Sequence, residues 1–244
     1  EATSGGIATA LIRDFISDGG FVAACLFEKG EFIFDITNDR RRAERFSGSK
    51  YVKSNPIGIY KKIQECLKKN KVLFIGLPCQ VAAVKNYVGD KENLYTVDLI
   101  CHGTPSPKLL QKSLRDYDVD LGDVDQISFR SKNDMGISVN GRRLIGRRVT
   151  DEYTCAFLKA IDYTENCYYC KFATIDRISD VTLGDSWGTD LQSEKEKGVS
   201  LLLIQTSKGV NLINNCVDIV LRPVDIKNAI ANNHQLKHPS VKRL

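Results

Sequence analysis

The alternation of apolar and polar residues in the N-terminal part of the chain predicts one helix followed by two paired strands. Apolar residues recur at helical spacing over 7–16, directly after the Ser-Gly-Gly stretch at 4–6, and Gly19-Gly20 provides a stop. The apolar segments 21–27 and 32–37 are separated by Glu-Lys-Gly-Glu, which is typical of two strands joined by a tight turn.

A second amphipathic helix is predicted from 56 to 69, with a proline near its first turn. Its inward-facing residues are predicted to be Ile57, Tyr60, Ile63 and Leu67.

Two successive strand-loop-helix units follow. The apolar strand at 71–76 leads through Leu-Pro-Cys-Gln into a helical pattern at 81–88, and the strand at 94–100 leads through Cys-His-Gly-Thr-Pro-Ser-Pro into another at 108–117. Such units favour neighbouring parallel strands, whose C-terminal ends lie at one edge of a sheet, where α/β folds bind ligands. Cys79 and Cys101 follow these two strands and are predicted to face the same crevice.

The remaining pattern completes an α/β fold with a mixed sheet and a cofactor crevice at the C-terminal strand ends. Further elements are predicted at 124–132, 137–149, 180–188 and 199–207 (strands), and at 152–161, 209–216 and 225–232 (helices). No further repeat is present, so we expect a single α/β domain over 1–244, with 190–244 its least defined part.

Composition indicates a soluble protein. The chain has 244 residues, of which 42% are hydrophobic and 27% charged, so it can bury a core without disulfides. No apolar run approaches the ~18 residues of a membrane span. The chain begins at Glu1 without a leader, and we expect a fragment of a longer cytoplasmic protein.

The net charge of +5 is mild, but arginines cluster at 39–45 and 140–148. Such clusters can hold an anionic ligand, or they can be solvated surface. No aromatic residues interleave with them as they would for base stacking, so nucleic acid is disfavoured as a partner.

The eight cysteines fall into two groups. The members of the first lie in apolar periodic segments and are interpreted as small core residues: Cys25, Cys66, Cys155 and Cys216. The members of the second lie in predicted loops beside Pro, Gly or His: Cys79, Cys101, Cys167 and Cys170.

Four loop thiolates match a tetrahedral zinc site and a cubane iron–sulfur cluster equally well in ligand number. One Cys-x-x-Cys pair with two cysteines from separate strand ends favours a cluster over zinc, which usually takes two short knuckles. Cysteines without metal remain the third possibility.

The order of several motifs resembles the β-subunit family of coenzyme F420 hydrogenase/dehydrogenase. The motifs are SGG at 4–6, GSKYVKS at 48–54, GLPCQVAAV at 76–84, VDLICHGTPSP at 97–107, ISFRSK at 127–132, CYYCKF at 167–172 and DVTLGDSWG at 180–188. The resemblance implies a flavoprotein that holds FAD and a 4Fe-4S cluster and passes electrons between them. Known members include deazaflavin-reducing subunits and chlorophyll-pathway reductases.

Carried over motif by motif, the resemblance implies that the cluster ligands are Cys79, Cys101, Cys167 and Cys170. Family members often carry a ferredoxin-like segment before the SGG motif. This sequence shows none, which fits an N-terminal truncation and leaves the onward electron route open. The expected partners are a redox partner protein or ferredoxin-like domain and a small-molecule hydride donor or acceptor.

The expected flavin site has a physical basis as well. A helix N-terminus opened by glycines binds a pyrophosphate, and nearby cations strengthen it, although a glycine pair is also typical of a simple turn. The candidate flavin-binding residues are Ser4, Gly5, Gly6, Lys50, Arg130, Lys132, Asp185 and Trp187. His102 is the candidate catalytic residue, as a proton donor or a partner of the cluster sulfur, unless it is an ordinary loop residue.

Two functions compete on this basis. The first is an enzyme in which FAD exchanges a hydride with a small molecule and single electrons with the cluster. The alternative is a non-catalytic zinc-stabilised module that binds an anionic partner through the arginine clusters.

Overall fold

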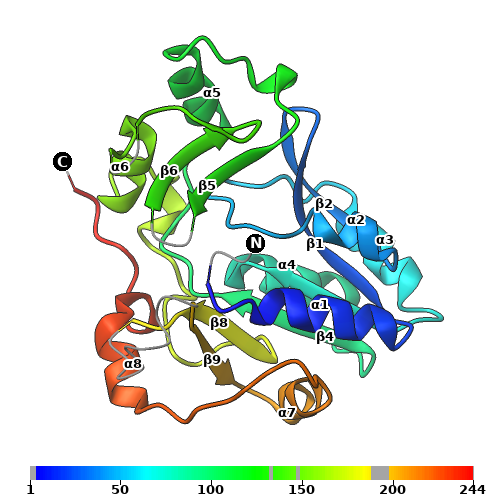
Figure 1. The fold of residues 1–244 in the computed structure, drawn as a ribbon. Coiled ribbons are helices and arrows are strands. Elements are labelled where there is room, and N and C mark those ends of the chain that lie inside the picture. Colours follow the sequence, from blue (N-terminus) through cyan, green and yellow to red (C-terminus); the bar gives the residue numbers. More distant parts are fainter. Residues whose placement is uncertain (1–3, 132–133, 147–148, 188–197, 244) are drawn as a thin grey trace.

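A six-stranded mixed sheet with the order β2-β1-β3-β4-β8-β9 forms the centre of the protein (Figure 1). The computed structural model describes residues 4–131, 134–146, 149–187 and 198–243. The strands of this sheet are β1 (Phe21–Glu28), β2 (Glu31–Thr37), β3 (Val72–Gly76), β4 (Leu94–Leu99), β8 (Val181–Asp185) and β9 (Ser200–Ile204). β1, β3, β4 and β8 run parallel, while β2 and β9 pair antiparallel at the two edges. The predicted α/β fold with a mixed sheet is confirmed.

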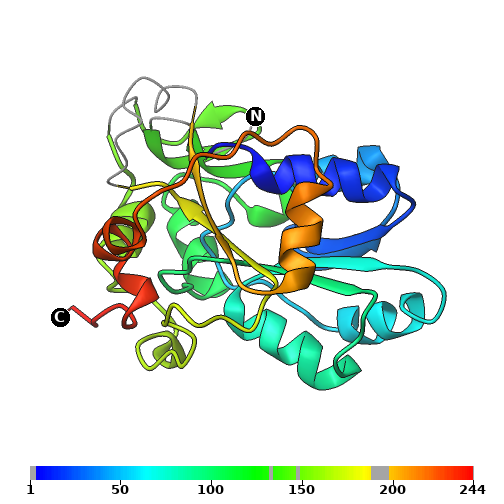
Figure 2. The same cartoon turned by 90° about the horizontal axis from the view of Figure 1, so that it is seen from below.

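Helices cover both faces of this sheet (Figure 2). α1 (Ile7–Ser17) and α7 (Ser207–Asn214) pack on one face, and α3 (Ile59–Cys66) and α4 (Pro78–Val88) pack on the other. The side chains of β3 alternate between the two resulting cores, as a strand buried on both faces requires. A short helix, α2 (Arg40–Glu44), follows β2 and was not predicted.

A smaller antiparallel sheet lies above the first in the view of Figure 1. It consists of β5 (Ile127–Ser131), β6 (Asp134–Val139) and β7 (Arg142–Arg143). Phe129 and Ile137 share a core with α5 (Pro107–Arg115), with α6 (Glu152–Leu158) and with the β1–β2 hairpin. The C-terminal helix α8 (Ile226–Asn232) packs near β9 and Ile100.

The two predicted strand-loop-helix units are confirmed. β3 leads into α4 and β4 leads towards α5, and the two strands pair in parallel from Val72 opposite Leu94 to Gly76 opposite Asp98. Their C-terminal ends are therefore level at one edge of the sheet.

One part of the helix prediction for 56–69 is wrong. Ile57 is 86% exposed, and α3 begins only at Ile59, after Gly58 adopts a φ of 79°. The reason is that Asn55 is tied to β2, donating its N–H to the Phe32 carbonyl at 2.7 Å, so the preceding chain stays extended. Ile63 is fully buried, as expected.

Candidate functional site

Cys79 and Cys101 follow neighbouring parallel strands at the level edge of the sheet. β3 ends at Gly76, and Cys79 lies in the first turn of α4; β4 ends at Leu99, just before Cys101. The placement of Cys79 in a loop was wrong, because Pro78 suits a first helical turn and the Leu77 N–H donates to Gln80 Oε1 at 2.8 Å.

Backbone pairing brings the loop after Cys101 to the segment that carries the Cys-x-x-Cys pair. The Thr164 N–H donates to the Thr104 carbonyl at 2.9 Å. Cys167 Sγ lies 3.3 Å from Thr164 Oγ1 and 3.7 Å from Thr104 Oγ1. Gly103 makes this approach possible, because it has a φ of 142° and a Cβ there would lie 2.2 Å from the Tyr163 ring.

The thiols of Cys79, Cys101, Cys167 and Cys170 lie within electrostatic range of one another. Burial is the largest of the causes that raise the pKa of Cys101, and the nearby thiols of Cys79, Cys167 and Cys170 raise it further. The pKa of Cys79 is likewise raised by burial and then by Cys170 and Cys167. A positive partner at this edge would favour the thiolate forms of Cys79 and Cys101.

The same thiols do not form a compact single-ion site. Across the described ranges, no three His, Cys, Asp or Glu side chains are placed so that they could hold a metal ion. The remaining cysteines lie elsewhere: Cys25 in β1, Cys66 in α3, Cys155 in α6 and Cys216 after α7.

The Ser-Gly-Gly entrance of α1 packs against the start of β9. The Gly5 N–H donates to Ser200 Oγ at 2.9 Å, and Ser4 Oγ donates to the Val199 carbonyl at 3.1 Å. A Cβ on Gly5 would lie 2.6 Å from the Ser200 nitrogen, so this position requires glycine. Gly6 caps the helix with a φ of 87°.

Arg130 and Asp185 belong to the same region. Arg130 Nη1 donates to Asp185 Oδ2 at 2.5 Å, and Asp185 is the β8 partner of Ser200 in β9. Burial opposes the charge of Arg130, but Asp185 outweighs it and raises the pKa of the guanidinium. The structure therefore brings Ser4, Gly5, Gly6, Arg130 and Asp185 together.

The structure describes two of the three remaining predicted flavin residues, which are Trp187, Lys50 and Lys132. Trp187 is 51% exposed, and its backbone N–H donates to the Asp185 carbonyl at 3.0 Å. The Lys50 ammonium donates to the Phe46 and Ser47 carbonyls after α2, and burial lowers its pKa to about 8. Lys132 lies outside the described residues.

His102 is held by the C-terminal segment. Its Nδ1 lies 2.7 Å from Gln235 Nε2, and its carbonyl accepts a hydrogen bond from Ser240 Oγ at 2.7 Å. His102 is exposed as a residue and lines a cavity with the C-terminal segment. The protein packed around it lowers the pKa of His102, as does His234, while Asp185 acts in the opposite direction.

A buried ion pair between Arg177 and Asp98, which sequence reasoning missed, lies beside the contact of Gln235 with His102. Arg177 Nη1 lies 4.0 Å from Asp98 Oδ2 in β4, and both side chains are buried. Arg177 Nη2 also donates to the Gln235 carbonyl at 3.3 Å.

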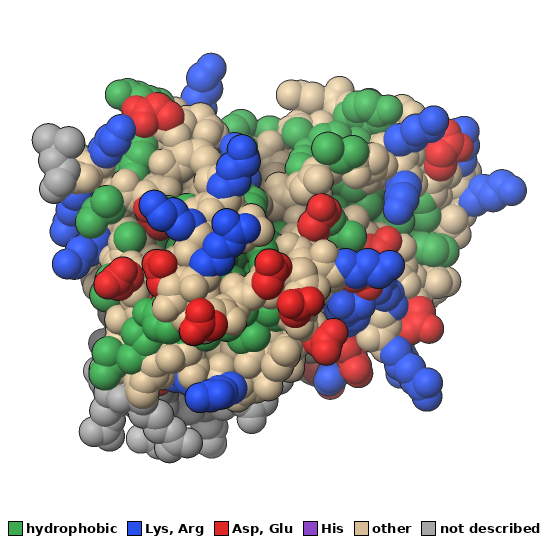
Figure 3. Space-filling view, turned by 90° about the horizontal axis from the view of Figure 1, so that it is seen from above, with side chains coloured by type: hydrophobic (Ala, Val, Ile, Leu, Met, Phe, Trp, Pro, Cys, Tyr) green, Lys and Arg blue, Asp and Glu red, His purple; other side chains and the backbone are tan. Residues whose placement is uncertain are grey.

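The first arginine cluster is engaged in ion pairs. Arg42 binds Glu28 and Asp35, and Arg45 also binds Glu28. In the second cluster Arg143 binds Asp134. On the face drawn in Figure 3, Lys and Arg side chains are interspersed with Asp and Glu, which does not favour an extended anionic polymer there.

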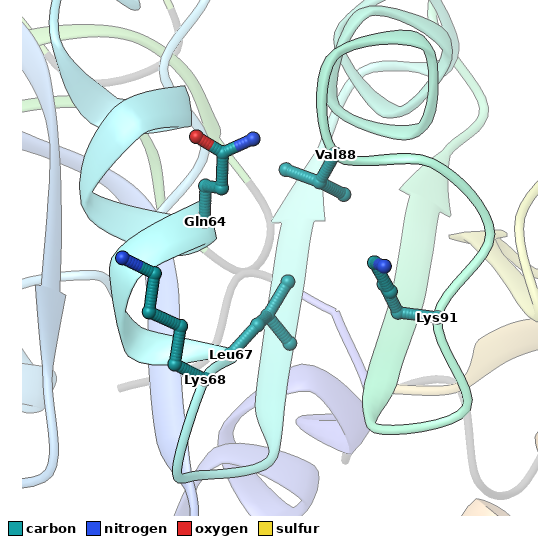
Figure 4. Close-up of a pocket in the computed structure, with 5 residues that line it drawn as sticks. All are labelled: Gln64, Leu67, Lys68, Val88 and Lys91. Carbon is teal, nitrogen blue, oxygen red and sulfur yellow. The ribbon is translucent and has the colours of Figure 1, made fainter.

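A separate pocket of about 330 Å³ lies between α3 and the end of α4 (Figure 4). It is lined by Gln64, Leu67, Lys68, Val88 and Lys91. These residues lie near the N-terminal ends of β3 and β4, so the pocket is at the opposite end of the strands from the thiols.

The comparisons with known proteins concern the family and the fold. A family model that describes the C-terminal part of the coenzyme F420 hydrogenase/dehydrogenase beta subunit matches residues 69–225. The chain belongs to this family. A chain of the F420-reducing NiFe hydrogenase complex from Methanosarcina barkeri matches with a TM-score of 0.65 and 21% identity, over 96% of this chain and 85% of that one. At that identity the likeness concerns the fold.

Membership of the coenzyme F420 hydrogenase/dehydrogenase beta-subunit family makes the protein a redox protein of the beta-subunit type. The family match includes the four proposed ligand cysteines, His102, Arg130 and Asp185, but ends before α8 and Gln235. None of the described helices combines the length and the apolar character that a membrane crossing needs.

Proposed function

We propose that the protein is a flavin-dependent oxidoreductase, or a subunit of one, that exchanges a hydride with a small molecule and passes single electrons through a 4Fe-4S cluster. The observation that carries this proposal is the gathering of Cys79, Cys101, Cys167 and Cys170 at one sheet edge. When bound, a flavin supplies two-electron hydride chemistry and single-electron transfer together, and a cluster carries single electrons.

The donor set fits an iron–sulfur cluster better than a single zinc ion. A cubane presents its iron atoms at separate corners, so its four thiolates can lie further apart than the ligands of one ion. The four thiols interact electrostatically, yet no three described donors surround a single point. Burial is the largest cause of the raised pKa of Cys101, and this thiol is half-buried just after the end of β4.

The region around Gly5 and Asp185 would hold the flavin. The first N–H groups of α1 have no helical acceptor and no side-chain cap, which favours a pyrophosphate at this end of the helix. Arg130 would add positive charge beside it, oriented by Asp185. The exposed Trp187 indole offers an apolar wall for an aromatic ring.

His102 would move or hold a proton next to the flavin and the iron–sulfur cluster. Its Nδ1 faces Gln235 Nε2, so Nε2 is the ring nitrogen left for a substrate or cofactor atom. As the neighbour of Cys101, it can also donate a hydrogen bond towards a ligand sulfur.

The partners follow from this chemistry. We infer a small-molecule hydride donor or acceptor at the flavin, and a redox protein or ferredoxin-like domain at the cluster. The cytoplasm is the proposed compartment, since thiols stay reduced there.

Anaerobic reconstitution with iron, sulfide and FAD, followed by iron, sulfide, zinc and flavin assays, tests the proposal. We expect about four iron and four sulfide per chain, one flavin, and visible absorption that bleaches on reduction. A colourless protein that takes up one zinc and no flavin would instead support the zinc-stabilised module and contradict the redox function.

A further inference from the structure

A cavity of about 220 Å³ lies between the loop after β4, the end of α6 and the C-terminal segment 234–243. Its lining residues are His102, Leu158, Lys159, Ala160, Tyr163, His234, His238, Ser240, Val241 and Arg243. This lining contains two full cations and no acidic side chain.

The cations of the cavity have no anionic partner among the described residues. Lys159 ends α6, Arg243 belongs to the C-terminal segment, and both are exposed. Neither makes an ion pair with a described acid, whereas the neighbouring Lys242 is bound to Glu165 at 2.9 Å. Two unpaired positive charges from separate elements therefore converge on one hollow.

All three histidines of the chain line this cavity. The rings of His102 and His234 have centroids 5.8 Å apart, and those of His234 and His238 are 5.2 Å apart. Because the Gln235 amide Nε2 faces His102 Nδ1 and His234 Nε2, these two nitrogens accept, and His102 Nε2–H and His234 Nδ1–H are left as donors for a ligand. His238 donates its Nδ1–H to the Pro239 carbonyl at 2.9 Å.

Buried groups hold these rings in place. Gln235 is 1% exposed, and its Nε2 lies 2.7 Å from His102 Nδ1 and 3.0 Å from His234 Nε2. Ser240 Oγ, also buried, donates to the His102 carbonyl. The lining is thus prearranged by contacts inside the protein, which lowers the cost of ordering it around a ligand.

We propose that this cavity binds a compact oxyanion, the phosphate or carboxylate group of a small molecule. Lys159 and Arg243 supply its charge neutralisation, and the histidines supply directed hydrogen bonds. Burial, and then the neighbouring His238, lower the pKa of His234.

The cavity and the proposed redox site share His102. A ligand whose anionic group is bound in the cavity would therefore lie beside the loop that carries Cys101. The idea that the cavity anchors the redox substrate rests on the proposed function. Binding of the anion itself does not, and this binding can be measured without flavin or cluster.

The test follows the ring signals of the three histidines by NMR in the full chain, at constant ionic strength set with sodium chloride. Inorganic phosphate and succinate are titrated separately, and the signals are assigned with single histidine variants. We expect saturable shifts of His234 and His238, stronger with phosphate for a phosphate-bearing ligand and stronger with succinate for a carboxylate.

Matched variants give the decisive comparison. Arg243→Ala and Lys159→Ala should each raise the Kd about tenfold, because each removes one charge-assisted contact. Lys237→Ala removes an exposed lysine of the same segment that does not line the cavity, and its Kd should equal that of the wild type. Shifts that never saturate, or equal weakening in all three variants, would overturn the proposal. A protein that binds phosphate normally but takes up no flavin would leave the anion site standing and contradict only the redox function.

Discussion

Arg130 in β5 and Asp185 at the end of β8 form an ion pair with 2.5 Å between Nη1 and Oδ2. The pair joins the small sheet to the central sheet, and both side chains are largely buried, at 14% and 24% exposure. Because Asp185 is also the β-partner of Ser200, the pair connects the small sheet with the glycine entrance of α1. The predicted flavin residues that make these contacts thus belong to one interconnected region.

Arg130→Ala should destabilise the protein by about 1–3 kcal/mol, because it leaves the Asp185 carboxylate poorly solvated and unpaired. Urea unfolding measures this effect. The double variant Arg130→Ala/Asp185→Ala should cost clearly less than the sum of the single variants. Flavin content after reconstitution should fall in Arg130→Ala, and unchanged content would show that Arg130 does not hold the flavin.

Cys167→Ala should lose most of its iron and sulfide while it keeps its flavin, because it removes one proposed cluster ligand far from the Gly5 region in sequence. Iron, sulfide and flavin assays on the anaerobically reconstituted protein check this. Cys155→Ala is the matched control, since that thiol lies within α6 and contacts the Thr150 carbonyl. Equal iron loss in both variants would exclude a specific ligand role for Cys167.

Gly103→Ala should destabilise the fold by about 2–4 kcal/mol and reduce cluster content together. Its Cβ would collide with the Tyr163 ring, and its backbone has a positive φ, so the loop carrying Cys101 must move away from Cys167. Thermal unfolding and iron assays measure the two effects. Gly141→Ala also has a positive φ but meets no atom within 4 Å, so it should cost only about 1 kcal/mol and leave cluster content intact.

Glu28→Gln should lower stability at pH 7 by about 1 kcal/mol, because the carboxylate is paired with Arg42 and Arg45. Arg42 first, and then Arg45, lower the pKa of Glu28 to about 2. The stabilisation is therefore complete above the unfolded pKa of about 4.3 and is lost as the pH falls towards 2.

Urea unfolding of wild type and Glu28→Gln at pH 7 and near pH 2 tests this sign, and the difference should shrink at the lower pH. Glu65→Gln serves as the control, because its pair with Lys68 is exposed and should contribute little. A difference that grows on acidification would show that the pair does not lower the pKa of Glu28.

Sequence patterns determined the elements whose signal is local. The apolar runs of β3 and β4, each followed by a helical pattern, indicated two parallel strands, and from them the shared edge of Cys79 and Cys101 followed. Periodicity suffices there because burial of a strand or a helix face depends on residues close in sequence. The family motifs added the expected chemistry, which patterns of polarity do not contain.

Only the tertiary structure decided which distant residues meet. Ile57 fits a helical stripe, but the pairing of Asn55 with β2 delays the helix and leaves Ile57 in solvent. The contact of Gln235 with His102 spans 133 positions, and that of Arg130 with Asp185 spans 55. No local pattern encodes such pairs, because they depend on where the complete chain path places each segment, and the cavity lined by the three histidines exists only as a result of those contacts.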